Sequence, residues 1–193
     1  MTEQELLGGL RAAALSERDP TTSDDVLAVL ISEAERVSAA RILEIGTGRG
    51  LTSAALALRT GAEVVTIERD AARIASAREN FARFGLEGRI RLLEGDAAHI
   101  LPSLEGAFDL IFLDAAKVQY RRFLPDCRRL LAAGGTLCAD DVLLFADGVP
   151  KKRHMLAQHI REFLQDLQQD RAFETRILHV GKGLAVARKK EDE

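Results

Sequence analysis

Apolar residues along the chain gather in short runs that alternate with longer stretches of helical periodicity. Five runs have the length and aliphatic content of buried strands, and they cover residues 41–45, 63–67, 89–93, 108–113 and 136–139. Between the runs, apolar residues recur at spacings of three and four. This alternation is typical of βαβ units, so the sequence predicts an α/β fold with a mostly parallel sheet and helices on both faces.

The interior helices have recognisable ends. Asp70 has the side chain of an N-cap, apolar residues follow at helical spacing as far as Phe84, and Gly85 ends the stretch. A second helix is expected after Lys117 and is predicted to run to residue 133, because two glycines follow it. A third covers residues 151–169 and carries its apolar residues on one side.

The two ends of the chain differ from this interior pattern. Residues 174–180 and 184–188 are strand candidates joined by a Gly-Lys-Gly turn, which predicts a C-terminal antiparallel hairpin in a seven-stranded sheet. Before the first strand lie two helical stretches, 3–16 and 23–37, separated where Pro20 interrupts the pattern. We expect this break to be either a plain helix corner or part of a lid over the ligand site.

Composition narrows the class of protein. The chain has 193 residues, of which 47% are hydrophobic and 30% charged, so one folded domain is expected and disorder is excluded. We place a helical cap region at residues 1–38 and the α/β core at residues 39–190. No apolar run approaches the roughly 18 residues of a membrane span, and the N-terminus lacks the pattern of a secretory signal. Two cysteines make neither a disulfide framework nor a metal knuckle, so we expect a cytoplasmic protein with no membrane partner.

The formal net charge of −3 argues against a strongly basic nucleic-acid binder. Three local basic clusters nevertheless stand out, at residues 121–122, 128–129 and 151–153. They are either solvated faces or a phosphate-contact surface near the mouth of a cleft.

A glycine-rich loop, E-I-G-T-G-R-G at residues 44–50, follows the first strand and precedes a helix. Glycines let the chain turn tightly and let a ligand approach the backbone, although an ordinary strand–helix turn is the alternative. A pyrophosphate cofactor would use the spacing G-x-G-x-x-G, but Leu51 stands where the third glycine would fall, which disfavours a nicotinamide-dependent oxidoreductase. Glu44 would repel a pyrophosphate and suits a cofactor with a cationic amino group.

Carboxylates also stand at the ends of the next two strands. Glu68 is placed to accept hydrogen bonds from ribose hydroxyls, and Asp96 with Ala97 suits an adenine edge. Together with the glycine loop, these residues resemble the class I S-adenosylmethionine-dependent methyltransferases, whose fold is Rossmann-like. The resemblance implies that S-adenosylmethionine is the cofactor. The residues expected around it are Glu44, Gly46, Thr47, Gly48, Glu68, Arg69, Asp96, Ala97 and Asp114.

A further group of acids follows the fourth and fifth strands. Asp114 comes after one buried strand, and Asp140 with Asp141 comes after the next, so the three carboxylates are expected at one edge of the sheet. Oxygen-only ligands favour a hard cation such as Mg²⁺, Mn²⁺ or Ca²⁺. Lys117 starts the following helix and faces the same cleft, while Tyr120, one turn later, either lines the site or packs beside it.

The pattern D-A-A-K-x-x-Y, with the paired acids after the following strand, resembles the cation-dependent O-methyltransferases. That family includes the catechol and caffeoyl-CoA enzymes and a bacterial branch that methylates 5-hydroxyuridine in tRNA. The motif sequence of this chain is most similar to that of the bacterial branch. The resemblance implies that Asp114, Asp140 and Asp141 bind the metal, and that Lys117 is the general base in a catalytic pair with Asp114. Members commonly carry Asn at the position of Asp141, so the extra charge should tighten cation binding.

The sequence leaves the acceptor open. It is either 5-hydroxyuridine in tRNA or a small catechol-like phenol, and the resemblance implies a homodimer. The alternative to an enzyme is a catalytically silent module that binds S-adenosylmethionine and acts through protein contacts. The presence of Lys117 and of all three acids argues against that alternative.

Overall fold

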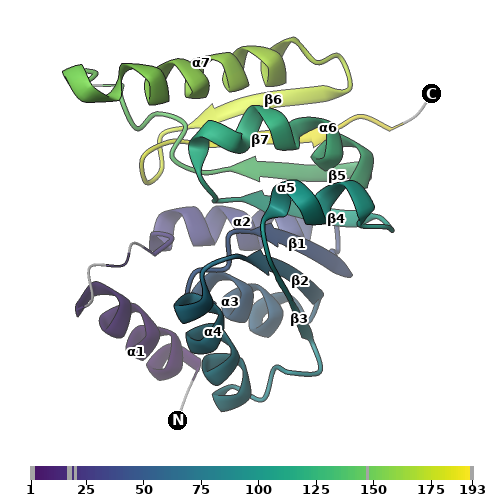
Figure 1. Ribbon diagram of the computed structural model, residues 1–193. Helices are drawn as coiled ribbons and strands as arrows, with labels where there is room; N and C mark the ends of the chain where they lie inside the picture. Colours follow the sequence, from purple (N-terminus) through teal and green to yellow (C-terminus); the bar gives the residue numbers. More distant parts are fainter. Residues whose placement is uncertain (1–2, 17–18, 20, 147, 192–193) are drawn as a thin grey trace.

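The computed structural model describes residues 3–16, 19, 21–146 and 148–191. Within them, one sheet has the strand order β3-β2-β1-β4-β5-β7-β6 (Figure 1). Strands β1 to β5 are parallel, and β7 runs antiparallel to both β5 and β6, which confirms the predicted sheet and its C-terminal hairpin. The strands are β1 (Arg41–Ile45), β2 (Glu63–Glu68), β3 (Ile90–Glu94), β4 (Phe108–Leu113), β5 (Leu131–Ala139), β6 (Phe173–Leu178) and β7 (Leu184–Lys189).

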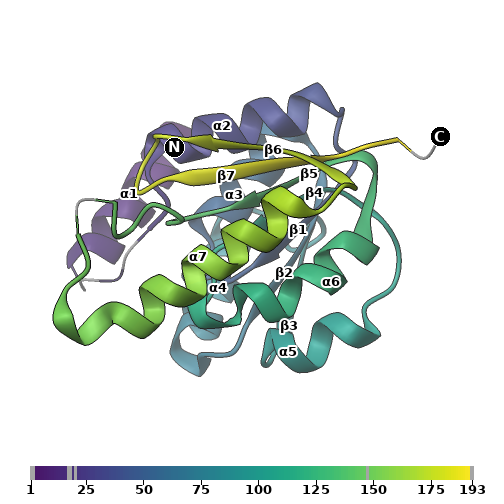
Figure 2. The ribbon, with the colours of Figure 1, turned by 90° about the horizontal axis from the view of Figure 1, so that it is seen from above.

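Helices cover both faces of this sheet, as predicted. Figure 2 shows α5, α6 and α7 together on one side and α2 on the other. The α-helices are α1 (Glu3–Ser16), α2 (Asp24–Arg36), α3 (Leu51–Thr60), α4 (Ala71–Arg83), α5 (Ala97–Ile100), α6 (Tyr120–Leu130) and α7 (His154–Gln169). Short 3-10 turns cover Leu101–Ser103, Lys117–Gln119 and Lys151–Arg153. No helix among the described residues is long and apolar enough to cross a membrane.

The core lies on both faces of the central strands, because alternate side chains of a strand point in opposite directions. Ile111 and Leu113 of β4 join the apolar cluster beneath α5, α6 and α7. Leu110 and Phe112 of the same strand join the cluster beneath α2, α3 and α4. Burial on both faces is typical of parallel strands and explains why their sequences read as continuous apolar runs.

The capping residues and glycines in the sequence predict some ends of helices correctly and one wrongly. Asp70 caps α4 as predicted, since its side chain accepts a hydrogen bond from the backbone N–H of Arg73. Pro20, predicted to interrupt the helical pattern, lies outside the described residues. The helix predicted to run to residue 133 ends at Leu130 instead, and β5 begins at Leu131.

Sheet pairing explains that error. Leu131 pairs with Phe108, and the β4–β5 register then shifts so that Leu110 pairs with Thr136. The glycines at 134–135 therefore lie inside a strand irregularity, where a Cβ on Gly135 would come within 2.9 Å of the Asp109 carbonyl oxygen. Glycine inside a strand often marks such a close backbone approach, and here it does not mark the end of a helix.

Candidate functional site

A pocket of about 400 Å³ opens at the carboxyl ends of the parallel strands, the edge where α/β sheets place their ligands. It is lined by the loops that follow β1, β2, β3, β4 and β5, together with residues of α1 and the α1–α2 connection. Eleven predicted site residues line it, which are Gly46, Thr47, Gly48, Glu68, Arg69, Asp96, Ala97, Asp114, Lys117, Asp140 and Asp141. Glu44 is the predicted site residue that does not line it.

The glycine loop is held directly against the end of β4. Gly46 has φ +106°, and a Cβ there would lie 2.1 Å from the backbone oxygen of Asp114. The backbone N–H of Asp114 donates to the Ile45 carbonyl oxygen at 2.9 Å. Only glycine fits this close approach. The cofactor loop and Asp114 are therefore held in one rigid arrangement.

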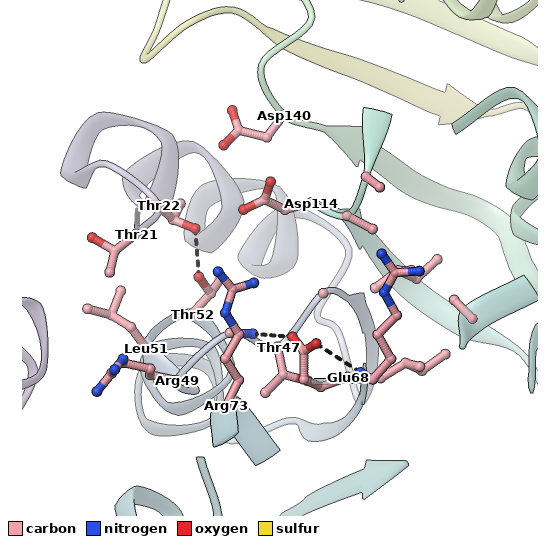
Figure 3. A pocket seen from close by; sticks show the side chains of 18 of the residues that line it. Thr21, Thr22, Thr47, Arg49, Leu51, Thr52, Glu68, Arg73, Asp114 and Asp140 are labelled. Atoms are coloured by element: carbon pink, nitrogen blue, oxygen red, sulfur yellow. Dashed lines mark hydrogen bonds between the residues drawn. The ribbon is translucent and has the colours of Figure 1, made fainter. Parts of the chain in front are cut away.

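Glu68 is a preoriented hydrogen-bond acceptor. Its side chain is buried, and its carboxylate accepts backbone hydrogen bonds from Gly48 at 2.9 Å, Arg69 at 2.8 Å and Asp70 at 3.0 Å. In Figure 3 it lies on the side of the pocket formed by the glycine loop, below Asp114 and Asp140. A carboxylate fixed in this way can accept from a ligand's hydroxyls without first being ordered.

Asp96 is fixed in a similar manner beyond β3. Its carboxylate accepts from the backbone N–H of Ala98 at 2.9 Å and from the Arg69 guanidinium at 3.3 Å. The hydrogen bond from Ala98 and the charge of Arg69 hold the pKa of Asp96 below its ordinary value, against a smaller effect of burial. The carboxylate is therefore ionised at neutral pH and available to a ligand's N–H groups.

Glu44 lies beneath the loop and outside the pocket. It is 1% exposed and accepts hydrogen bonds from the hydroxyls of Ser53 and, at 2.7 Å, Thr66. Burial raises the pKa of Glu44 to about 8, and the charges of Asp114 and Glu68 add to that rise, against these two hydrogen bonds. The side chain is mainly protonated at neutral pH, and its contacts fasten β1 to α3 and β2.

The three acids and Lys117 converge on the other side of the pocket. The Lys117 ammonium is 2.7 Å from Oδ1 of Asp114 and 3.3 Å from Oδ2 of Asp141. Asp140 is 7% exposed and lies beside them. Burial and the charges of Asp114 and Asp141 raise the pKa of Asp140 to about 7. One ammonium therefore faces three carboxyl groups, and the cluster has an excess of negative charge.

Lys117 responds to two opposing influences. Burial lowers the pKa of its ammonium, but the carboxylates of Asp114 and Asp141 raise it by more in sum, so the net pKa lies above the ordinary value. Tyr120 packs beneath the cluster, where it is 1% exposed and its hydroxyl donates to the Leu113 carbonyl oxygen at 2.9 Å. Of the two roles left open for Tyr120, the structure supports packing.

A family model described as O-methyltransferase matches residues 13–190, nearly the whole chain. The chain belongs to this O-methyltransferase family. Among curated relatives, it is 38% identical over 138 residues to O-methyltransferase ankF of Aspergillus thermomutatus, which covers 66% of this chain and 57% of that protein. It is 37% identical over 116 residues to a catechol O-methyltransferase of Niastella koreensis, covering 57% of this chain and 52% of that protein. The aligned part thus spans little more than half of either relative.

A solved structure of this O-methyltransferase fold matches along the whole chain. The SAH-bound methyltransferase PaMTH1 of Podospora anserina superposes with a TM-score of 0.85 at 28% identity, covering 99% of this chain and 89% of that one. This agreement confirms the predicted class I methyltransferase fold.

Several pocket residues of this chain were not identified from its sequence. Thr22 and Thr52 share a buried hydrogen bond of 2.8 Å between their hydroxyls, shown as a dashed line in Figure 3. Arg49 and Arg73 line the pocket and bind Asp19, which comes from the α1–α2 connection. The only sequence signal for this region was the interrupted helical pattern, for which a lid was one interpretation. Asp19 pairs with residues 30 and 54 positions away, and contacts at such separations produce no local sequence pattern.

Proposed function

We propose that the chain is an S-adenosylmethionine-dependent and divalent-cation-dependent O-methyltransferase that acts on a small catechol-like phenol. One observation carries the proposal. Asp114, Asp140, Asp141 and Lys117 converge in the same pocket as Glu68 and the glycine loop. Nucleoside-binding groups and groups that can activate a hydroxyl therefore share one pocket. A silent cofactor-binding module would have no need of the second set.

The adenosyl side of the pocket is assigned to the cofactor. Glu68 would accept hydrogen bonds from the ribose hydroxyls, and Asp96 with Ala97 would hold the adenine. Gly46, Thr47 and Gly48 would surround the methionine portion, where the backbone can approach closely. Support comes from the carboxylate of Glu68, which three backbone N–H groups hold in place, and from the SAH bound in the fungal structure of similar fold.

The opposite side of the pocket is assigned to a divalent cation held by Asp114, Asp140 and Asp141. As the side chains stand, no group of three or more His, Cys, Asp or Glu among the described residues is arranged to hold a metal ion. Lys117 instead contacts two of the three acids. The chemistry of the set nevertheless fits a hard cation, because all donors are carboxylate oxygens. Burial, with the charges of Asp114 and Asp141 added, raises the pKa of Asp140 to about 7. When bound, such an ion would lower the pKa of a coordinated hydroxyl.

Lys117 is the proposed general base. Its Nζ must be neutral to accept the proton of the acceptor hydroxyl, and the acids that now surround it favour the charged form. When those carboxylates are occupied as ligands, burial is the main influence left on Lys117, and burial favours the neutral amine. The deprotonated acceptor oxygen would then bond to the methyl group of S-adenosylmethionine while the C–S bond breaks and SAH leaves, which would neutralise opposite charges within the pocket.

The acceptor is proposed to be small because most of the cationic side chains near the cleft are already paired. Arg49 and Arg73, which line the pocket, bind Asp19, and Arg69 binds Asp96. Of the predicted basic clusters, Arg121 binds Glu162 and Asp166, while Arg128 and Arg129 line a separate hollow and bind Asp170 and Asp126. These arginines are therefore less available to phosphates. 5-Hydroxyuridine in tRNA stays the second candidate, since Lys151, Lys152 and Arg153 are exposed in the 3-10 turn just before α7.

Incubation with labelled S-adenosylmethionine and either a catechol panel or bulk tRNA distinguishes the two acceptors. We expect label in the catechol and none in the tRNA. Label in the tRNA alone would make the second candidate the function, and label in neither would support the silent module.

Replacing Glu68 with alanine should weaken binding of S-adenosylmethionine by about 1–3 kcal/mol, the range for a lost hydrogen bond to a charged group. Titration calorimetry measures the effect, with Glu63→Ala as the control. Glu63 lies exposed at the opposite end of the same strand, so its loss should leave the affinity unchanged. Equal affinities for both variants, or binding of NAD in place of the adenosyl cofactor, would contradict the assignment.

We also propose that the enzyme is a homodimer. The side chains of Leu15, Val118 and Met155 are more than half exposed in the single chain, and a second copy could cover such apolar surface. Sedimentation should give twice the mass of the chain. A clean monomer at micromolar concentration would contradict the proposal.

A further inference from the structure

Part of the cofactor pocket is built by the N-terminal segment, meaning helix α1 with residues 19, 21 and 22 of the α1–α2 connection. Leu10 and Ala14 of α1 line the pocket, as do Asp19, Thr21 and Thr22. The glycine loop and Glu68 line the same pocket from the sheet side. A bound adenosyl cofactor would therefore lie between the sheet and the N-terminal segment.

The apolar attachment of α1 is small. Leu10 packs with Leu27, Leu51 and Ala55 in a small cluster, and the partly buried Leu7 packs against this cluster and against the one beneath α2, α3 and α4. The side chain of Leu15, near the end of the helix, is 64% exposed. Elements with few buried apolar contacts open locally at low free-energy cost. The N-terminal segment therefore reaches the main core through few apolar side chains and can open at low cost.

Polar contacts brace the N-terminal segment internally. Arg11 donates to the Thr22 carbonyl oxygen at 2.6 Å and pairs with Asp24 at 2.6 Å, which ties α1 to the start of α2. The backbone N–H of Asp19 donates to the Ala14 carbonyl oxygen at 2.9 Å. Asp19 is thus fixed to the end of α1, so that the partners of its carboxylate also hold the helix in place.

The carboxylate of Asp19 joins this segment to both walls of the cofactor pocket. Its Oδ2 is 3.1 Å from Nε of Arg49, which belongs to the glycine loop, and its Oδ1 is 2.6 Å from the guanidinium of Arg73 in the first turn of α4. The Asp19 side chain is only 14% exposed, so solvent screens these pairs less than it screens ordinary surface pairs. Figure 3 shows Arg73 and Arg49 at the pocket with Glu68 and Thr52.

We propose that Asp19, through its ion pairs with Arg49 and Arg73, holds the N-terminal segment closed over the bound cofactor, and we call these ion pairs the clasp. The demethylated product SAH then leaves only after the clasp has opened. The inference rests on the proposed use of the pocket for an adenosyl cofactor. Asp19 acts through the arginines and the segment it positions, not on the reacting atoms. Its effect therefore falls on the rate of cofactor exchange.

The test is the release of labelled SAH, chased with excess unlabelled SAH, from the wild-type protein and two variants. Asp19→Asn should release SAH about tenfold faster or more, because two hydrogen bonds between charged groups are weakened. Asp24→Asn is the matched control. It removes an ion pair of the same N-terminal region, but Asp24 is 86% exposed and outside the pocket, so release should change by less than about twofold.

Hydrogen exchange supplies a readout that does not depend on release. Bound SAH should slow amide exchange along α1 in the wild-type protein and in Asp24→Asn, and this protection should be lost in Asp19→Asn. Arg73→Gln breaks the same contact from the other side. If the clasp is one unit, the double variant Asp19→Asn/Arg73→Gln should release SAH no faster than the faster single variant.

The failures of the clasp and of the proposed function can be told apart. Wild-type protein that binds no SAH would overturn both. SAH binding with equal release rates in wild type and Asp19→Asn would overturn the clasp alone. Equal acceleration by Asp24→Asn, or additive effects in the double variant, would show general loosening of the N-terminal region and would also overturn it.

Discussion

Asp140→Ala should abolish methyl transfer while leaving the affinity for SAH unchanged. Asp140 is the most buried of the three clustered acids, and burial together with the charges of Asp114 and Asp141 raises its pKa to about 7. Losing a group that merely orients a metal ligand typically costs about 10–100-fold in affinity or activity, so loss of a ligand should cost more than about a hundredfold. Added Mg²⁺ or Mn²⁺ should not restore the variant. The Glu68 side of the pocket is untouched, and calorimetry with SAH checks that.

Asp141→Asn is the control for this loss. Asp141 has φ +58°, a left-handed conformation that asparagine adopts as readily as aspartate. The variant keeps the backbone and one oxygen donor but lowers the negative charge of the cluster. It should stay active and need more cation. Asp140→Ala protein with wild-type turnover would mean that the carboxyl group has only a structural role.

Lys117→Ala should lower kcat by about 10²–10⁴, the usual contribution of a positioned general base. The amine acts when neutral, so the wild-type rate should rise with pH as Lys117 and the acceptor lose protons, and then level off. Burial lowers the pKa of Lys117, while the carboxylates of Asp114 and Asp141 raise it by more in sum. When cation is scarce, these carboxylates are free to act on Lys117, so the increase in rate that its deprotonation causes should occur at higher pH. In Lys117→Ala, that increase should disappear.

Lys182→Ala is the matched control, because Lys182 also lines the pocket but lies in the turn between β6 and β7. It should stay within about threefold of the wild-type kcat, as expected for a lysine that takes no part in proton transfer. A Lys117→Ala enzyme with an unchanged pH profile would remove Lys117 from the mechanism. Both variants should keep their affinity for SAH.

The acid cluster could be predicted from the sequence because a single rule governs it. Asp114 and the pair at 140–141 each follow a buried parallel strand, and such strands end at the same edge of a sheet. The same rule places Glu68 and Asp96 at the pocket. Gly46 was also expected at this edge, and the structure adds a second reason for glycine there, the backbone oxygen of Asp114 that a Cβ would strike.

Other features depend on contacts that no local pattern encodes. Glu44 precedes the loop as expected, but the alternation of β1 directs its side chain to the face covered by α3, where Ser53 and Thr66 bind it. Leu131 follows a sequence with helical periodicity, yet its pairing with Phe108 places it in a strand. The pairing of Asp19 with Arg73 spans 54 residues and becomes visible only when the chain is folded.

Methyl transfer from labelled S-adenosylmethionine to a catechol, measured with and without excess chelator, tests the central claim most directly. The account predicts that chelator abolishes transfer, that Mg²⁺ or Mn²⁺ restores it, and that the SAH affinity measured in parallel does not change. Transfer at the full rate in excess chelator, with SAH still bound, would show that Asp114, Asp140 and Asp141 work without a cation and would contradict the proposed mechanism.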